Sequence, residues 1–498
     1  MTQRIVRIAL LGALLAAGTA AGEAVPLFGT AEIVLTSTAS YNGNGGEPNP
    51  FDLDVTAEVV SPGGRRFSAA GFFDGDGVGG AVGRVFKARI SADEAGTWRW
   101  SVASSVPGLN GRSGSFSVEG RLPGFFGKGP IVDNPGRPRV FRQQGGGPVF
   151  LTGKFLDVAA PSPIQYSHTL LSEELSEADR QAMLARHLGM RLNKINVYLA
   201  NRGDYGSVST TPWVGSADAN DKQRFDLRRW RSYDLWVERL RDSGFVAQLW
   251  FFADDSGFGD LPDADRRRLI RYGMARLSGY VNTMFTLALE WQEGWSAAEV
   301  EASGEFLQRN NPWARLASVH GVTGDFAFPA APWVDYLDLQ AGNSASHPAV
   351  HAMGLSNRAR ADKPLIQEEL GLGEENGENR RKAWAAFTAG AAGVGTGAFL
   401  EHLVAFVSRV DFARMEPADA LVPVGRAYAL AERGRAYVFY LYDGGTVRVD
   451  LRGAAGNFKA EWYNPRNGRF RPAPAVAGGK TRVFKAPSVE DWVLYVHL

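Results

Sequence analysis

Apolar and polar residues alternate over the first part of the chain. The period is two residues in Leu53-Asp-Val-Thr-Ala-Glu-Val-Val and in Thr97-Trp-Arg-Trp-Ser-Val. Turn-forming clusters such as Ser61-Pro-Gly-Gly and Asp74-Gly-Asp-Gly separate these runs. Several short alternating strands divided by such turns are typical of a β-sandwich. We therefore predict a β-sandwich over residues 25–120.

The pattern changes after a Gly-, Pro- and Arg-rich segment, residues 121–147, which we interpret as a linker with a small hairpin. Over residues 148–424, short apolar strands alternate with amphipathic segments of helical periodicity, which indicates repeated βα units. The predicted strands cover residues 149–155, 192–198, 246–252, 284–290, 316–320, 336–340, 364–369 and 395–401. Eight units over this length predict a (β/α)8 TIM barrel of the α/β class.

The period of two residues returns over residues 425–498. Thr446-Val-Arg-Val-Asp-Leu and Trp492-Val-Leu-Tyr-Val-His are examples, and Asn464-Pro-Arg-Asn-Gly is a turn. This pattern predicts a second, smaller β-sandwich after the barrel.

The N-terminus has the pattern of an export signal. Arg4 and Arg7 precede an apolar run over residues 8–17, and small residues follow at 18–21. A basic start, a short apolar run and small residues are typical of a cleaved signal peptide. We expect a signal peptide over residues 1–24 and a secreted or periplasmic protein; the alternative is an uncleaved N-terminal anchor.

Composition narrows the chemistry. The 498 residues carry a net charge of +1, which favours neither nucleic acid nor an acidic membrane surface as a partner. The chain has no cysteine, which excludes disulfides, thiolate metal sites and a cysteine nucleophile. The oligomeric state is left open.

The predicted barrel strands end on acidic residues. Strand four ends on Glu290, and strand seven ends on Glu368 and Glu369. Functional residues of such barrels lie at the C-terminal ends of the strands, and a buried carboxylate needs a compensating partner or a function. Because side chains alternate along a strand, Glu290 shares the direction of Thr286, and Glu369 shares the direction of Gln367. This alternation predicts that Glu290 and Glu369 face the barrel lumen.

Four stretches carry a resemblance to known families. Phe72-Phe-Asp-Gly and Glu94-Ala-Gly-Thr-Trp-Arg-Trp resemble an immunoglobulin-like domain of unknown function that precedes glycosidase barrels in many bacterial proteins. Trp462-Tyr-Asn-Pro-Arg-Asn-Gly resembles the small C-terminal β-sandwich that follows such barrels. Lys363-Pro-Leu-Ile-Gln-Glu-Glu-Leu-Gly is similar to the strand-seven motif of clan A glycoside hydrolases.

The last resemblance implies a retaining glycoside hydrolase that acts on a poly- or oligosaccharide without a cofactor. It implies that Glu369 is the nucleophile and that Glu290 is the acid/base. The residue before Glu290 is Leu289, where the family usually has an asparagine that contacts the sugar. Glu368 as the nucleophile and Glu293 as the acid/base remain alternatives.

Other residues at predicted strand ends, and nearby tryptophans, are candidates for carbohydrate contact. They are His320, Gln340, Tyr198, Trp250, Trp291, Trp295, Trp213, Asp254, Glu401 and Glu368. His347 and His351 have the i, i+4 spacing of a metal pair, but no third ligand accompanies them, so we predict no metal site. The rival hypotheses are a non-catalytic carbohydrate-binding or cell-envelope scaffold protein, and a lyase or transglycosidase that uses the same carboxylates.

Overall fold

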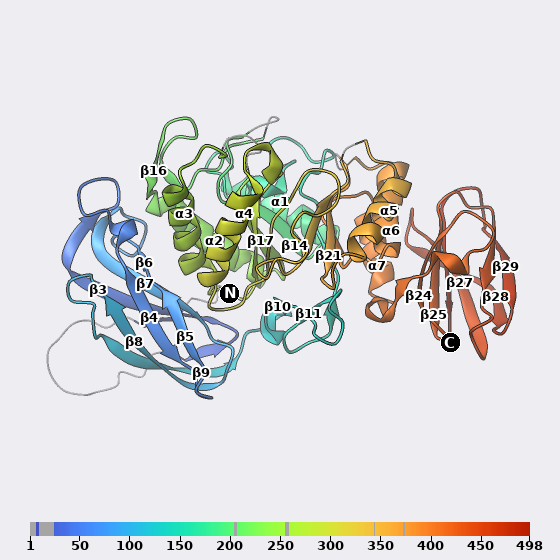
Figure 1. The fold of residues 1–498 in the computed structure, drawn as a ribbon, viewed down its shortest axis with the longest axis horizontal. Coiled ribbons are helices and arrows are strands. Elements are labelled where there is room, and N and C mark those ends of the chain that lie inside the picture. Colours follow the sequence, from blue (N-terminus) through green and yellow to red (C-terminus); the bar gives the residue numbers. More distant parts are fainter. Residues whose placement is uncertain (1–5, 9–23, 204–206, 254–257, 343, 372–373) are drawn as a thin grey trace.

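The computed structural model describes residues 6–8, 24–203, 207–253, 258–342, 344–371 and 374–498. Figure 1 shows an elongated arrangement in which a central region of strands and helices lies between an N-terminal and a C-terminal β region. Residues 6–8 form a short strand, and most of the predicted signal peptide lies outside the described residues, as does Asp254.

The N-terminal region contains two sheets whose apolar side chains share one core. The strand orders are β1-β3-β7-β6 and β2-β9-β8-β4-β5. Trp98 and Trp100, two positions apart in β8, are both buried in that core. The strands are β1 (Val6–Ile8), β2 (Val25–Leu27), β3 (Thr30–Asn42), β4 (Val55–Val60), β5 (Arg66–Ala70), β6 (Phe72–Phe73), β7 (Val82–Ser91), β8 (Gly96–Ser104) and β9 (Ser113–Arg121).

The segment predicted as a linker forms a small sheet beneath the central region. Its strands are β10 (Ile131–Val132), β11 (Phe141–Gln143) and β12 (Pro148–Val149). Phe141 is fully buried and belongs to one apolar cluster with Val246, Met284 and Ile366 from the central strands. The linker therefore closes the end of the central region opposite to the site described below.

The central region consists of parallel strands with helices on their outer side (Figure 1). The two four-stranded sheets have the orders β14-β17-β18-β19 and β13-β22-β21-β20, and all of their pairings are parallel. The strands are β13 (Leu151–Thr152), β14 (Lys194–Tyr198), β17 (Val246–Phe252), β18 (Thr283–Ala288), β19 (Ala317–Ser318), β20 (Leu337–Gln340), β21 (Leu365–Glu369) and β22 (Gly393–Val394). The helices are α1 (Glu177–Gly189), α2 (Leu227–Asp242), α3 (Asp263–Leu277), α4 (Ala297–Arg309), α5 (His347–Arg358), α6 (Gly377–Thr388) and α7 (Leu400–Val407), and β15 (Trp213–Gly215) pairs with β16 (Asn220–Phe225) in a hairpin.

Backbone contacts link the two sheets at both edges. A parallel bridge joins His320, just after β19, to Asp338 in β20. At the other edge, the Asn193 N–H donates a 3.1 Å hydrogen bond to the carbonyl of Thr152 in β13. The predicted mixed α/β class is therefore confirmed.

The eighth predicted strand, residues 395–401, is wrong in its position. The strand in the structure is β22, which ends at Val394. Gly397 and Phe399 have positive φ angles of 155° and 55°, which interrupt an extended backbone, and helix α7 begins at Leu400. Glu401 therefore lies in the first turn of a helix and does not end a strand.

The C-terminal region contains a six-stranded sheet, β23-β24-β25-β30-β27-β28, and a two-stranded sheet, β26-β29. The strands are β23 (Glu416–Pro417), β24 (Tyr428–Glu432), β25 (Ala436–Leu441), β26 (Thr446–Asp450), β27 (Asn457–Asn464), β28 (Arg469–Ala477), β29 (Thr481–Lys485) and β30 (Trp492–His497). These strands share a separate apolar core. Within the described part of the chain, no helix combines the length and the apolar character needed to cross a bilayer.

Candidate active site

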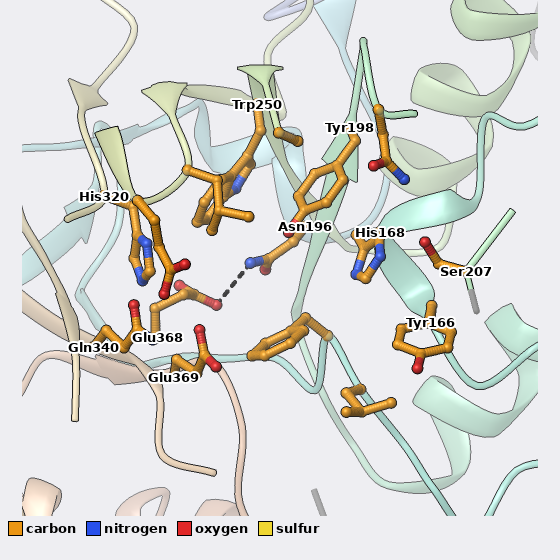
Figure 2. A pocket seen from close by; sticks show the side chains of 16 residues that line it. Tyr166, His168, Asn196, Tyr198, Ser207, Trp250, His320, Gln340, Glu368 and Glu369 are labelled. Atoms are coloured by element: carbon orange, nitrogen blue, oxygen red, sulfur yellow. Dashed lines mark hydrogen bonds between the residues drawn. The ribbon is translucent and has the colours of Figure 1, made fainter. Parts of the chain in front are cut away.

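A pocket of about 300 Å³ opens where the central parallel strands end. Figure 2 shows its side chains, which come from several different strands and from the loops that follow them. The lining residues are Phe155, Leu156, Tyr166, His168, Asn196, Tyr198, Asn201, Ser207, Trp250, Ala253, Leu289, Glu290, His320, Gln340, Glu368 and Glu369. Apolar walls with a few converging polar groups are typical of small-molecule sites.

Glu290 reaches the pocket through an unusual backbone conformation. Strand β18 ends at Ala288, and Glu290 follows in the left-handed region with φ 36° and ψ 48°. Such angles are costly for a residue with a Cβ atom, and they cluster at functional sites. The conformation ends the strand and starts the short 3-10 turn Trp291–Glu293.

Glu368 and Glu369 both line the pocket, although they are neighbours in β21. The pairing of β20 with β21 shifts register at this point, so that Leu339 pairs with Gln367 but Gln340 pairs with Glu369. A bulge of this kind adds one residue to a strand and breaks the alternation of its side chains. Glu369 is half-buried, whereas Glu368 is 1% exposed.

Glu369 lines the pocket as predicted, but the alternation from Gln367 is not the reason, because Gln367 does not point into the lumen. Its Nε2 donates a 3.0 Å hydrogen bond to the carbonyl of Val350 in helix α5, on the outer side. Ile366 instead belongs to the apolar cluster beneath the pocket, so the inward set continues from Ile366 to Glu368. Glu369 also lines the pocket, because the bulge breaks the alternation of side chains between Gln367 and Glu369.

A buried lysine holds Glu368. Lys194 Nζ donates to both carboxylate oxygens of Glu368, at 2.7 and 2.8 Å, and Asn196 Nδ2 donates to one of them at 2.8 Å. The hydrogen bond from Asn196 to Glu368 is drawn in Figure 2. Lys194 also donates to Asn196 and to Gln248, both at 2.6 Å. A buried carboxylate with a paired cation and an amide donor is held in one orientation.

Below this cluster lies a second buried carboxyl, that of Asp338. It accepts hydrogen bonds from Gln248 Nε2 at 2.9 Å and from Thr286 Oγ1 at 3.2 Å. Burial and the nearby charge of Glu368 raise the pKa of Asp338 well above its ordinary value. Lys194 is thus paired with Glu368, and the surroundings of Asp338 favour its protonated form.

Several polar atoms of the pocket have no hydrogen-bond partner among the described residues. They are both ring nitrogens of His320, the indole nitrogen of Trp250, the side-chain oxygen of Gln340 and Nδ1 of His168. Burial lowers the pKa values of His168 and His320 to about 3, so both rings are neutral near pH 7. Buried polar atoms are normally hydrogen-bonded, so this set is suited to a polar ligand.

Aromatic rings form the wall opposite the carboxylates. His168 stacks on Tyr198 with ring centroids 4.2 Å apart, and Tyr166 lies against the other side of His168 at 5.3 Å. Tyr198 in turn contacts Trp250 at 5.6 Å. Flat aromatic faces beside hydrogen-bonding groups suit a ring that has both apolar and hydroxyl surfaces.

The other residues predicted from the sequence lie around the pocket but not in its lining. Trp291 packs on Phe328 at the edge of an adjoining small cavity. Trp295 is buried against Phe252, and Trp213 is buried against Phe258. Glu401 lies in α7, and Glu293 is exposed just beyond Glu290. Asp254 lies outside the described residues.

His347 and His351 take part in the contact between α5 and the C-terminal region. His347 Nδ1 lies 2.9 Å from the hydroxyl of Tyr428, and His351 Nε2 lies 2.8 Å from Asp419. Among the described residues, no group of three or more His, Cys, Asp or Glu side chains is arranged to hold a metal ion.

Sequence reasoning missed Lys194, Asn196 and His168. A signal for the first two was present, because Lys194, Asn196 and Tyr198 alternate with apolar residues in a strand that is buried throughout. A lysine in the middle of such a strand indicates a buried partner of opposite charge. His168 lies in a 3-10 turn of the loop after β13, where no periodicity marks it.

Comparisons with known proteins agree with this architecture. Residues 24–105 match the family model described as "Domain of unknown function (DUF5060)", and residues 423–497 match the one described as "Putative collagen-binding domain of a collagenase". No curated protein matches the chain.

Solved structures extend the similarity over the whole chain. A structure described as a "putative glycoside hydrolase" from Bacteroides vulgatus superposes with a TM-score of 0.76 at 17% identity, over 95% of this chain and 99% of that one. A family 5 glycoside hydrolase from the same organism gives 0.61 at 17% identity, over 76% of this chain and 95% of that one. The chain therefore has the fold of multidomain glycoside hydrolase structures, with terminal domains similar to the two family models.

Proposed function

We propose that this protein is a retaining glycoside hydrolase whose central region is a (β/α)8 barrel between two β-sandwiches. Glu369 is the nucleophile and Glu290 is the acid/base. The observation that carries the proposal is the convergence of these carboxylates in one pocket at the ends of β18 and β21. The glycoside hydrolase names of the structures with the same fold support it.

The mechanism divides into two displacements at the anomeric carbon. In the first, the Glu369 carboxylate forms a C–O bond to the anomeric carbon, and the glycosidic oxygen leaves with the proton of Glu290. In the second, Glu290 takes a proton from water, the water oxygen attacks the same carbon, and the bond to Glu369 breaks. Two inversions retain the anomeric configuration. This route requires carboxyl groups about 5–5.5 Å apart.

The backbone at Glu290 supports its assigned role. A left-handed conformation at a residue with a Cβ atom is maintained only when its surroundings compensate for the cost. Here it turns the chain at the end of β18, so that Glu290 follows Leu289 into the pocket lining. A mobile side chain on a relaxed loop would be less well placed for proton transfer.

Glu368 is the alternative nucleophile, and its contacts favour a supporting role. Both of its oxygens accept from Lys194, and one also accepts from Asn196. A carboxylate fixed in this way is stabilised as an anion, and the hydrogen bonds reduce its nucleophilicity. In the proposal Glu368 therefore anchors the floor of the site, paired with Lys194.

The negative charge of Glu369 has a second function in the proposal. Glu290 must be protonated at the start of the reaction, and nearby anions favour the protonated form of a carboxyl group. We propose that the Glu369 carboxylate and partial burial hold the proton on Glu290 until the leaving oxygen takes it.

A non-catalytic carbohydrate-binding protein is the second candidate. The aromatic wall and the polar atoms without partners among the described residues would serve binding as well as catalysis. The asparagine expected before the acid/base is replaced by Leu289, and this replacement favours the non-catalytic candidate. The substrate of either candidate is a carbohydrate. Export of the protein is also part of the proposal and is supported by the residues over 1–24 alone.

Chemical rescue tests the catalytic assignment. We expect Glu369→Ala to lose at least about 10⁴-fold in kcat on an aryl glycoside, and azide to restore turnover by attacking the vacated face and giving an inverted glycosyl azide. Glu290→Ala is expected to keep its first step with a good leaving group and to give a retained azide product. Glu293→Ala, an exposed neighbour, is the matched control.

Wild-type turnover by both variants would contradict the two assigned roles. Azide rescue of Glu368→Ala in place of Glu369→Ala would transfer the nucleophile to Glu368. A protein that binds oligosaccharides but shows no Glu290- or Glu369-dependent turnover would be the non-catalytic candidate.

A further inference from the structure

The pocket has an unusual charge composition. Its lining includes three acidic residues, Glu290, Glu368 and Glu369, but no lysine or arginine within the described residues. The internal segments outside the description, residues 204–206, 254–257, 343 and 372–373, contain no lysine, arginine or histidine in their sequence. These segments therefore add no cation to the site.

Lys194 contacts the lining residues Glu368 and Asn196 from beneath the pocket, and its hydrogen-bonding capacity is used within the protein. Its ammonium group donates to Glu368, Asn196 and Gln248, and the residue is fully buried. An ammonium has three donors in total. None remains for an anionic group on a ligand, and a ligand anion would compete with Glu368 for the charge of Lys194.

The two histidines of the pocket do not supply positive charge either. His168 is stacked against Tyr198, and His320 lies 5.2 Å from the ring of Trp250, both in buried positions. Burial lowers the pKa values of both rings to about 3. Each ring can still exchange hydrogen bonds, with one nitrogen as donor and the other as acceptor.

The polar groups that remain are neutral and match hydroxyl groups. The indole N–H of Trp250 can only donate, the oxygen of Gln340 can only accept, and neutral imidazoles can do both. A hydroxyl is also both donor and acceptor. Specific recognition of a carboxylate or sulfate normally uses arginine or lysine, because two charge-assisted hydrogen bonds then compensate for its burial.

We infer that the sugar unit seated beside Glu290 and Glu369 is uncharged, so that the enzyme cleaves neutral glycosides and rejects uronic acid and sulfated units at this position. The inference rests on the proposed glycosidase function. A carboxylate in this pocket would be buried without a counter-ion and would face the Glu369 carboxylate, since Lys194 is already paired with Glu368. An uncompensated buried charge costs several kcal/mol, which corresponds to a loss in kcat/KM of at least about 100-fold.

Matched substrate pairs test the inference with the full-length protein. A glucoside and a glucuronide with the same aryl leaving group differ only at C6, which is a CH2OH group in the first and a carboxylate in the second. A galactoside and a galacturonide with that leaving group form a second pair. We expect the neutral member of the productive pair to have a kcat/KM at least about 100-fold higher. Equal or faster cleavage of a uronide, abolished by Glu290→Gln, would overturn this inference and leave the glycosidase function intact.

Binding gives a readout that does not need catalysis. Saturation-transfer NMR with free neutral sugars and the matching uronic acids is expected to show contact with the neutral members and none with the acids. Tighter binding of the acids would overturn the inference.

A variant with a cation in the pocket tests the electrostatic basis of the selectivity. Leu156→Arg places a cation in the pocket lining, and Leu156→Met is its size-matched neutral control. We expect the arginine variant to shift the uronide-to-glycoside ratio by about 10-fold or more toward the uronide, and the methionine variant to leave the ratio unchanged. A ratio unaffected by the arginine would contradict the electrostatic basis of the selectivity.

Discussion

At the scale of single residues, three acids reach one pocket by three different local arrangements. Glu290 depends on a left-handed backbone, Glu369 on a β-bulge and Glu368 on a buried lysine. The sequence predicted which strands carry the acids, because strand ends and acidic residues are visible in the pattern. It did not predict the direction of Glu368, because a bulge leaves no trace in the alternation of apolar and polar residues.

Lys194 should act on the site through Glu368. We expect Lys194→Met to lower the free energy of unfolding by about 3–5 kcal/mol, because it leaves the Glu368 carboxylate buried without its cation. The measurement is urea unfolding followed by fluorescence.

The double variant Lys194→Met/Glu368→Gln removes both charges and provides the matched control. It should recover part of the lost stability, since the uncompensated charge is gone. A double variant as unstable as the sum of the two single variants would contradict a direct pairing.

The buried histidines should make stability fall in acid. In the folded state the pKa values of His168 and His320 are about 3, below the ordinary value of 6.5, so the unfolded chain binds more protons between these limits. The free energy of unfolding therefore falls as pH falls below 6.5, by about 1.4 kcal/mol per pH unit for each histidine. Asp335 acts in the opposite direction, because burial raises its pKa to about 7 and so favours the folded state at lower pH.

Comparing His320→Gln with the wild type isolates the histidine effect. Between pH 6.5 and 5, the variant should gain about 1.4 kcal/mol per pH unit relative to the wild type, measured by urea unfolding. Parallel stability profiles for the two proteins would show that His320 titrates normally in the folded state.

At the scale of secondary structure, strand existence was predictable and strand length was not. The strand predicted over residues 246–252 matches β17 at both ends, because seven apolar or uncharged residues form it without interruption. The strand predicted over residues 395–401 failed, because Gly397 and Phe399 adopt positive φ angles that apolar patterning does not record. Helix α4 has a clear start in the sequence, since Ser296 and Glu299 form a capping box.

The short strand β22 shapes the active site through a glycine that follows it. A Cβ atom on Gly395 would lie 1.8 Å from Glu368 Oε1 and 2.5 Å from the Glu368 carbonyl oxygen. Because these distances are far below contact, Gly395→Ala should displace Glu368 from Lys194 and lower kcat by at least about 10-fold. Steady-state kinetics and urea unfolding would measure both effects.

Gly189→Ala is the matched control, because a Cβ there meets nothing within 4 Å. Gly189 is the last residue of α1, where alanine is well tolerated. Unchanged kinetics in Gly395→Ala would mean that Glu368 has room to move without consequence for catalysis.

At the scale of the whole molecule, the N-terminal region is joined to the central region by a buried ionic cluster. Asp234 in α2 pairs with Arg89 from β7 at 2.6 Å and with Arg276 from α3 at 2.8 Å. Arg276 also pairs with Asp74 after β6 at 2.8 Å, and all four side chains are at most 1% exposed. Ion pairs between distant segments cannot be derived from a sequence pattern, so this junction could not be predicted.

Asp234→Ala should loosen this junction. The change leaves two buried guanidinium groups without their shared carboxylate, and it should lower the free energy of unfolding by about 3–5 kcal/mol. Asp450→Ala, which removes an exposed pair with Arg452, is the control and should change stability little. Differential scanning calorimetry measures the melting temperatures of both variants. Equal melting temperatures would contradict a structural role for the ionic cluster.

The location of a covalent intermediate tests whether Glu369 is the nucleophile. A fluorinated neutral aryl glycoside forms the glycosyl-enzyme quickly and releases it slowly, so intact-mass spectrometry should show one added sugar mass. After digestion, fragmentation of the peptide that contains Glu368 and Glu369 locates the label. We expect one glycosyl ester on Glu369 in the wild-type protein and none in Glu369→Gln. A label on Glu368, or no label on an enzyme that turns over the parent glycoside, would contradict this assignment.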